Sequence, residues 1–221
     1  MKKKELMKSG FGHYLMWKIH ALVSPYFRRR RIDLFIKILN PLESTNILDV
    51  GGGADFWELS ELTILNLFTP PDDIAAKYSH NFHFVKGDGR HLVYDNNSFD
   101  IVFSNSVIEH VGTFADQVRF ANEALRVGKN VWIQTPAREF FIEQHTLTPF
   151  SHYLPKNFQK RLMKNFTLWG LIGRLTQKQC KEFLDSLNLL SYADLQYLFP
   201  ECKILKEKFW FFTKSYTVVK K

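Results

Sequence analysis

Cysteine is scarce in this chain of 221 residues. Only Cys180 and Cys202 occur, and their separation in the sequence matches no common spacing of metal ligands. A disulfide-stapled scaffold and a zinc-finger domain are therefore excluded, and we expect no bound metal. Two thiols without a partner are typical of a protein in the reducing cytoplasm, where both should serve as packing residues.

Long apolar runs are also missing. No stretch approaches the roughly 18–20 residues that a membrane-spanning helix needs. The lysine-rich start is followed by no apolar segment with a small-residue cleavage site, so the sequence predicts no signal peptide. We expect a cytoplasmic protein with one main domain, because this length is ample for a single hydrophobic core.

Positive charge is in excess, with a formal net charge of +8, and much of it lies near the N-terminus. Lysines open the chain, and Arg28 to Arg31 form an unbroken run among aromatic and aliphatic residues. Helical periodicity over residues 1–22 and 28–39 predicts an N-terminal helical arm over residues 1–41. Its charges are interpreted as a solvated outer face or as peripheral contact with an anionic membrane; nucleic acid is a further alternative.

The centre of the chain alternates between strand-like and helix-like segments. Short apolar runs predict strands at residues 46–50, 62–67, 82–85, 99–104 and 130–134. A helix is expected over residues 113–126, with Phe114, Val118, Ala121 and Leu125 on its buried face. This alternation indicates an α/β fold with a Rossmann-like, mostly parallel sheet and helices on both faces.

The C-terminal third predicts a cap and two further strands. Residues 137–191 are rich in aromatic residues and too long for a simple crossover, so we expect a helical cap inserted between strands five and six. A helix is predicted within it over residues 177–187. Alternating runs at residues 202–208 and 214–220 complete a seven-stranded sheet with an antiparallel edge, within a main domain of residues 42–221.

Polar residues gather where the predicted strands end. A parallel sheet binds ligands at the carboxyl ends of its strands, so these residues predict one ligand site. Three glycines follow the first strand, and glycine permits a positive φ and a close approach of the ligand to the backbone. The strand-end residues are Asp49 to Gly53, Asn66, Asp88, Asn105 to His110 and Thr135.

Three motifs appear in a telling order: D-V-G-G-G at residues 49–53, G-D-G at 87–89, and S-F-D-I-V-F-S-N-S-V-I-E-H-V at 98–111. Together they resemble the class I S-adenosylmethionine-dependent methyltransferases, and more closely the type 11 methyltransferase domain. The resemblance covers about residues 46–136. It implies a methyltransferase that uses S-adenosylmethionine and acts on a small-molecule or a lipid- or glycan-linked acceptor.

The resemblance also implies roles for individual residues. The methionine and ribose parts of the cofactor would meet Asp49, Gly51, Gly52 and Gly53. Asn66 occupies the position that usually grips the ribose hydroxyls. Asp88 would accept from the adenine amine with Gly89 beside the ring, and Asn105 would lie at the methionine end.

This sequence departs from the family pattern near the glycine turn. Asp55 replaces the third small residue, the following helix is shortened to about residues 56–60, and Asn66 replaces an acid. These departures leave open a methyltransferase-like binding module without turnover. A methyltransferase acting on nucleic acid is a further alternative, but the chain reads S-N-S-V after the fourth strand instead of a base-methylation motif, so we do not expect a nucleic-acid partner.

Methyl transfer to oxygen or nitrogen requires alignment and a base. Glu109 and His110 follow the fourth strand on one loop and face the expected substrate entrance. Glu143 and His145 come shortly after the fifth strand, and histidine titrates near neutral pH. The candidate catalytic residues are therefore His110, Glu143 and His145.

Overall fold

The computed structural model describes residues 26–53, 57, 62–78, 82–146, 148–166 and 176–221. These form two compact units. The sheet unit comprises Leu39–Glu139 and Asn188–Lys221, and the cap unit comprises Met1–Ile38 and Phe140–Leu187. The predicted helices over residues 1–22 and 56–60 lie outside the described residues, apart from Trp57. The boundary expected between an arm of residues 1–41 and a domain of residues 42–221 stays a prediction.

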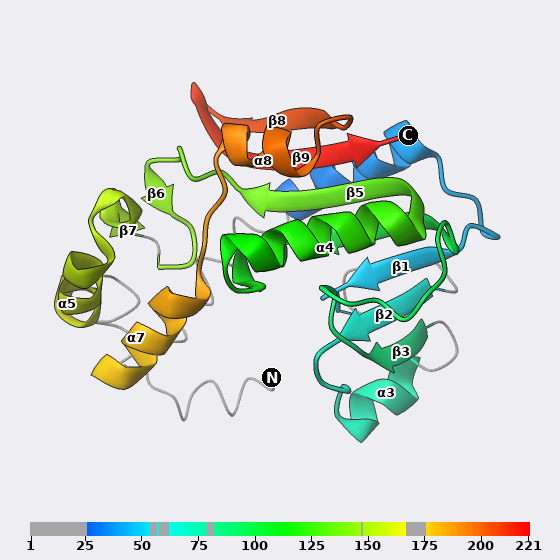
Figure 1. Ribbon diagram of the computed structural model, residues 1–221, viewed down its shortest axis with the longest axis horizontal. Coiled ribbons are helices and arrows are strands. Elements are labelled where there is room, and N and C mark those ends of the chain that lie inside the picture. Colours follow the sequence, from blue (N-terminus) through cyan, green and yellow to red (C-terminus); the bar gives the residue numbers. More distant parts are fainter. Residues whose placement is uncertain (1–25, 54–56, 58–61, 79–81, 147, 167–175) are drawn as a thin grey trace. The chain divides into compact units, whose positions relative to one another are not determined.

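The sheet unit contains a seven-stranded sheet in the order β3-β2-β1-β4-β5-β9-β8 (Figure 1). Its first five strands run parallel, β9 is antiparallel to β5, and β8 is antiparallel to β9. The α/β fold with a mostly parallel seven-stranded sheet is therefore confirmed. The strands are β1 (Ile47–Val50), β2 (Leu62–Asn66), β3 (Phe82–Lys86), β4 (Phe99–Asn105), β5 (Gly128–Pro136), β8 (Lys203–Phe209) and β9 (Phe212–Lys220).

Continuous apolar runs explain the central strands. All four residues of β1 are buried, and β4 and β5 each carry runs of consecutive buried residues. A strand covered on both faces has no solvent-facing side, so its sequence lacks the alternation of an edge strand. The hairpin of β8 and β9 is more exposed to solvent, because the residues of β8 are exposed or half-buried.

Helix α4 (Phe114–Val127) was predicted in the right place, but its buried face is offset from the predicted one: Ala121 is buried as predicted, Val118 and Leu125 are half-buried, and Phe114 is exposed. It begins at a capping box of Thr113 and Asp116. The buried positions are Gln117, Phe120, Ala121, Ala124 and Val127, whereas Phe114 is 43% exposed. The reason is Gln117, whose amide donates to the Ile108 and Asn188 carbonyls and so turns a polar residue toward the interior.

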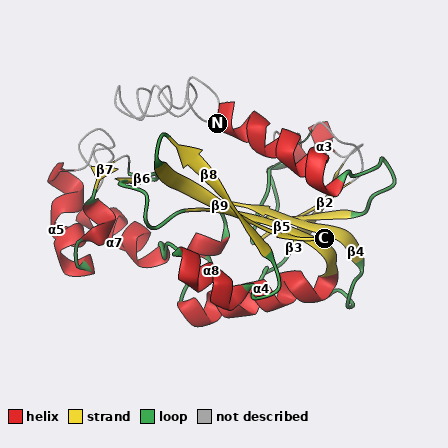
Figure 2. Cartoon of the chain, turned by 90° about the horizontal axis from the view of Figure 1, so that it is seen from above, coloured by secondary structure: helices red, strands yellow, loops and turns green. Residues whose placement is uncertain are grey.

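Among the described residues, the sheet unit also contains two further helices and one 3₁₀ turn. They are α3 (Asp72–Tyr78), α8 (Tyr192–Leu198) and η2 (Ile108–His110). Helices α4 and α8 lie on the same side of the sheet (Figure 2). Helix α8 begins at Ser191, whose side chain and that of Asp194 form a second capping box.

The cap unit has its own small core. Residues 26–39 form a helix that includes the predicted segment 28–39. Helix α7 (Gln177–Ser186) packs on α5 (Lys156–Phe166) through Met163, Cys180 and Leu184, with Phe183 beside them. Cys180 is buried in this core, where it serves as a packing residue, as expected. Short strands β6 (Ile142–Glu143) and β7 (Thr148–Pro149) and the 3₁₀ turn η3 (Ser151–Tyr153) complete it.

Within the described residues, no helix combines the length and the apolar character required to cross a bilayer.

Candidate functional site

The glycine turn after β1 is fixed by close packing. Gly51 has a φ of +79°, and its N–H donates to the Leu65 carbonyl over 2.8 Å. A Cβ at Gly51 would lie 2.5 Å from a methyl carbon of Val107, so a side chain is excluded there. A Cβ at Gly53 would meet no atom of the described residues within 4 Å. The turn is therefore tight at its start and open at its end, which leaves space for a ligand.

Asp49 lies directly beneath this turn. Its carboxylate is buried, and a Cβ on Gly52 would come within 1.7 Å of its Oδ2 atom. Trp57 Nε1 donates to Oδ2 over 2.6 Å, while Oδ1 has no hydrogen-bond partner among the described residues. Burial raises the pKa of Asp49 to about 7, although the Trp57 hydrogen bond acts in the opposite direction.

No pattern in the sequence indicates that Trp57 would hold Asp49. The ring of Trp57 packs edge-on against Phe103, with 4.6 Å between centroids, and its indole nitrogen donates to the Asp49 carboxylate. Eight residues separate the two partners, and no local periodicity links them.

Asn66 stands at the end of β2, beside the glycine turn. Its Nδ2 donates to the Gly52 carbonyl over 2.9 Å, and its own carbonyl accepts from the Gly87 N–H. An ionised acid at this position could not donate to Gly52. The amide that departs from the family pattern thus holds the turn in place.

Asp88 is engaged by its neighbour Arg90. The guanidinium donates from Nε and Nη2 to both carboxylate oxygens, at 2.6–3.0 Å. These hydrogen bonds lower the pKa of Asp88 below its ordinary value, so the group is ionised at neutral pH. A Cβ on Gly89 would lie 2.7 Å from Val50 and 2.8 Å from Phe120, which brings this turn close against β1 and α4.

The loop after β4 completes this edge of the sheet. Asn105 ends the strand, and Ser106 has a φ of +57°. The Ser106 N–H donates to the Gln134 carbonyl, and its hydroxyl donates to the Gln134 side chain. This turn aims Val107 at Gly51. The predicted cofactor residues on β1, β2, β3 and β4 therefore share one sheet edge.

Glu109 was expected to face a substrate entrance, but it points into the interior of the sheet unit. Its side chain is fully buried and accepts from the Thr135 hydroxyl over 3.0 Å, and its carbonyl accepts from the Asn188 N–H. Glu109 thus ties η2 to β5 and to the start of the last segment. His110, the next residue, has an exposed side chain in the sheet unit.

Glu143 and His145 form a hydrogen-bonded pair in the cap unit. His145 Nδ1 lies 2.7 Å from Glu143 Oε1, and the backbone N–H groups of His145 and Thr146 donate to the same carboxylate. Burial alone would raise the pKa of Glu143, but these donors outweigh it and lower the pKa to about 2. Glu143 is therefore an ionised acceptor that orients the imidazole of His145.

A pocket of about 260 Å³ lies inside the cap unit. Its wall is mostly apolar, and it includes the buried Thr146, whose hydroxyl has no partner among the described residues. The sequence did not point to this pocket, because its lining comes from five separate elements (β6, β7, η3, α5 and α7) and the residues between them. The lining residues are Glu143, Thr146, Thr148, Pro149, Phe150, Ser151, Leu154, Gln159, Leu162, Met163 and Leu184.

Comparison with known families and structures agrees with this geometry. Residues 48–130 match the family model described as a methyltransferase domain. No curated protein matches the chain. The matched span contains the glycine turn, the Asp88 turn, β4 and α4, which are the elements that build the sheet-edge site.

Solved structures share the fold at low identity. The PH0226 protein from Pyrococcus horikoshii OT3 is 18% identical, with a TM-score of 0.57 over 86% of this chain and 89% of its own. A protein described as a Zn-dependent alcohol dehydrogenase from Rhodobacter sphaeroides is 12% identical, with a TM-score of 0.58 over 86% and 88%. A protein described as a sarcosine dimethylglycine methyltransferase from Galdieria sulphuraria is 16% identical, with a TM-score of 0.51 over 86% and 64%. At these identities the likeness concerns the fold alone.

Proposed function

We propose that this chain is an S-adenosylmethionine-dependent methyltransferase that methylates a small-molecule or a lipid- or glycan-linked acceptor, with His145 as the base. The match of residues 48–130 to a methyltransferase domain supports the activity. The observation that carries the proposal is the hydrogen bond between the half-buried His145 and the buried Glu143, which lines a pocket with a mostly apolar wall. The match to an enzyme domain favours turnover over the alternative of a binding module.

The residues at the sheet edge fit the cofactor. The open side of Gly53 admits a ligand against the backbone, and the buried Oδ1 of Asp49 retains an unused acceptor for a ligand N–H. We assign Asp49 and Gly51 to Gly53 to the methionine and ribose portions, with Asn66 beside the ribose. Asp88 with Gly89 is assigned to the adenine, and Asn105 to the methionine end. When bound, the cofactor supplies the electrophilic methyl group.

His145 is proposed to accept the acceptor's proton. Ionised Glu143 holds Nδ1 in its protonated form, so Nε2 is the nitrogen with a lone pair for a proton. A positioned general base of this kind contributes roughly 10²- to 10⁴-fold to a rate. His110 remains a second candidate, because its exposed side chain follows β4 directly.

The pocket supports an acceptor with an apolar part. Leucine, methionine and phenylalanine side chains form its wall, and Thr146 and Glu143 offer only a few polar atoms. Small-molecule sites commonly combine such a wall with a few converging polar groups. The Galdieria protein, described as acting on sarcosine and dimethylglycine, is consistent with a small acceptor.

Binding and turnover can be tested separately. Calorimetry should detect binding of S-adenosylhomocysteine, and Asp88→Ala should weaken it by about tenfold or more, the loss of one charge-assisted contact. The exposed Asp95→Ala is the matched control and should bind as wild type does. Absence of binding by the wild-type chain would defeat the cofactor assignment.

The base assignment has its own assay. Transfer of labelled methyl groups to a cell extract should fall by roughly 10²-fold in His145→Gln. Binding of S-adenosylhomocysteine should not change. His83→Gln, an exposed histidine on β3, serves as the control. Equal transfer by the two variants would refute a role for His145.

Peripheral membrane contact of the basic N-terminal segment is also proposed, from its lysines and interleaved aromatic residues. Replacing Lys2, Lys3, Lys4 and Lys8 with glutamine should weaken co-sedimentation with anionic vesicles. Unchanged sedimentation would exclude the segment as a membrane anchor.

A further inference from the structure

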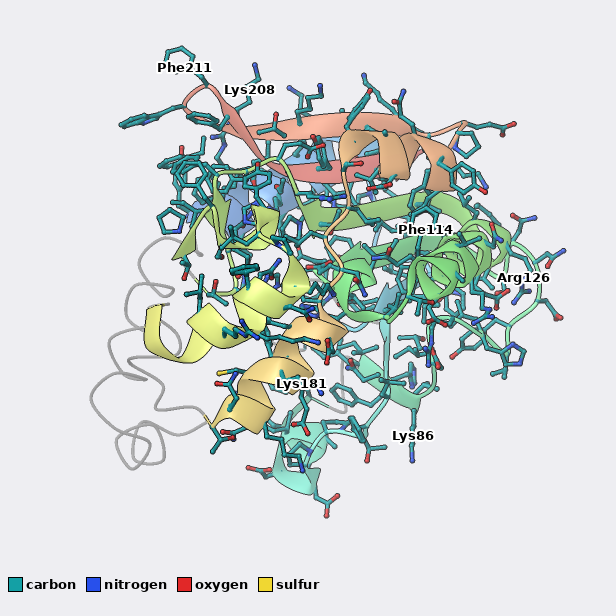
Figure 3. All side chains as sticks on the ribbon, turned by 60° about the vertical axis from the view of Figure 1, so that its left-hand side comes forward. Lys86, Phe114, Arg126, Lys181, Lys208 and Phe211 are labelled. Carbon is teal, nitrogen blue, oxygen red and sulfur yellow. The ribbon has the colours of Figure 1, made fainter. Side chains whose placement is uncertain are left out.

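The β8–β9 hairpin ends in four consecutive aromatic residues, Phe209 to Phe212. Trp210 and Phe211 form the turn between the paired residues Phe209 and Phe212. Trp210 is 82% exposed and Phe211 is 93% exposed. The rings of Phe209 and Trp210 are nearly parallel, with 5.9 Å between their centroids. The tip therefore presents a compact apolar surface to solvent, and Phe211 projects at its end (Figure 3).

The turn retains these side chains against its own conformational preference. Trp210 has a φ of +53°, in the left-handed region where a bulky side chain is disfavoured. Two-residue hairpin turns normally place glycine or asparagine at such a position. Trp210 packs into no core that would compensate for this strain, because most of its surface is exposed. A favourable interaction of Trp210 that offsets this strain must therefore involve a partner outside the sheet unit.

Positive charge flanks the aromatic tip. Lys206 and Lys208 are exposed on the part of β8 nearer the tip, and Figure 3 shows Lys208 close to the tip; the Lys206 ammonium lies 4.4 Å from the centroid of the Tyr192 ring. The acidic residue of this hairpin, Glu207, accepts from the Ser215 hydroxyl over 2.6 Å and lies 3.9 Å from Lys214. Its charge is thus directed into the hairpin, and the surface near the tip is left basic.

We propose that this hairpin tip inserts into the interface of an anionic phospholipid bilayer. Tryptophan and phenylalanine favour the boundary between headgroups and acyl chains, and lysines beside them meet the anionic headgroups. A protein partner fits less well. Two exposed aromatic side chains bury about 150–250 Å² each, about half of the roughly 800 Å² per partner of a stable protein interface. Insertion between lipids needs only such a small wedge.

This contact is separate from the basic N-terminal segment and from the acceptor's identity. Vesicle binding is measured without cofactor or acceptor, so its outcome does not depend on the proposed reaction. A failure of the methyltransferase assays would leave this proposal standing, and the reverse also holds.

The test is co-sedimentation of the full chain with phosphatidylcholine vesicles, with and without phosphatidylglycerol. The wild-type chain should bind the mixed vesicles. The double variant Trp210→Gly, Phe211→Ser should lose about tenfold or more in partitioning, since it removes most of the inserted apolar area. Lys206→Gln with Lys208→Gln should lose up to about fivefold per lysine, and only on vesicles that contain phosphatidylglycerol.

Two controls match these changes. Val93→Ser alters another exposed apolar side chain, 84% exposed, and Lys178→Gln alters a lysine that is 85% exposed. Both should bind as wild type does. The hairpin variant should also melt no lower than wild type, because glycine relieves the positive φ at position 210.

Three results would overturn the proposal. The wild-type chain could fail to bind the mixed vesicles, or the Trp210→Gly, Phe211→Ser variant could bind them as strongly as wild type. Alternatively, gel filtration could show a wild-type dimer that this variant converts to a monomer, with no vesicle binding. That outcome would assign the tip to a second copy of the chain.

Discussion

Replacing Asp49 with asparagine should stabilise the cofactor-free protein at neutral pH while weakening its hold on cofactor. The carboxylate is buried beneath Gly52 with one donor, Trp57, and its pKa is raised from 3.8 to about 7. Folding at a pH above 7 therefore forces a charge into a poorly solvated place. An amide removes that charge and keeps an oxygen for the Trp57 indole.

The magnitude follows from the pKa difference. A rise of about three units at ~1.4 kcal/mol each costs the folded state ~4 kcal/mol when Asp49 is ionised. The new NH₂ group would occupy the place of Oδ1, which has no partner among the described residues, at a cost of ~1–3 kcal/mol. The net stabilisation expected from Asp49→Asn at pH 8 is thus ~1–3 kcal/mol.

The stabilisation expected from Asp49→Asn depends on pH. A carboxyl whose folded pKa is raised contributes stability that is fully present below the unfolded pKa, near 3.8, and is lost as the pH rises to about 7. The advantage of Asp49→Asn should therefore be absent near pH 4, grow between pH 4 and 7, and level off above pH 7. Urea unfolding of the cofactor-free chain at several pH values measures this curve.

Asp100→Asn provides the matched control. The Lys129 hydrogen bond lowers the pKa of Asp100, so this substitution should lose stability as the pH rises through 4, which is the opposite trend. A pH-independent effect of Asp49→Asn, or a destabilisation that grows toward pH 8, would refute the reasoning. Stronger binding of S-adenosylhomocysteine by this variant would contradict the cofactor role of Asp49.

Two further predictions concern the same sites. Gly52→Ala should lower the free energy of unfolding by ~2 kcal/mol or more, because its Cβ would lie 1.7 Å from Asp49. Gly53→Ala, whose Cβ would meet no described residue within 4 Å, should unfold at the same denaturant concentration as wild type. Equal midpoints for the two variants would refute the packing described at Gly52. Glu143→Gln should lower the free energy of unfolding by up to ~3 kcal/mol at pH 7. The lowered pKa of Glu143, about 2, gives the wild-type protein stability that is present above pH 4.5 and lost as the pH falls toward 2. It should also shift the pH profile of methyl transfer downward, because His145 loses its anionic partner; an unshifted profile with an unchanged rate would exclude that partnership.

Local sequence patterns were enough to predict the sheet. The apolar runs of β1 and β4 and the glycines after β1 are short-range signals, and each one specifies a strand or a turn without reference to the rest of the chain. Strand alternation then indicates a parallel sheet, whose geometry places Asp49, Asn66 and Asp88 at one edge. The fold class was predicted correctly on this basis. The methyltransferase domain that residues 48–130 match was indicated by the resemblance of the three motifs at residues 49–53, 87–89 and 98–111.

The state of each polar side chain was decided by tertiary structure. The apolar spacing of α4 predicted Phe114 as buried. Instead Gln117 is buried, because its amide donates to the carbonyls of Ile108 and Asn188. Glu109 was expected beside an entrance and is instead buried against Thr135. Neither partner is near in sequence, and a hydrogen bond to a distant group leaves no periodic trace.

Sequence alone therefore determined where the chain forms strands, where it turns, and which residues stand at the ends of the strands. Tertiary structure decided what those residues do there: Trp57 holds Asp49, Asn66 holds Gly52, and Glu143 is kept ionised by His145 and Thr146. The physical reason is range. Strand and turn propensities act over a few residues, whereas burial and hydrogen bonding depend on groups that only the folded chain brings together.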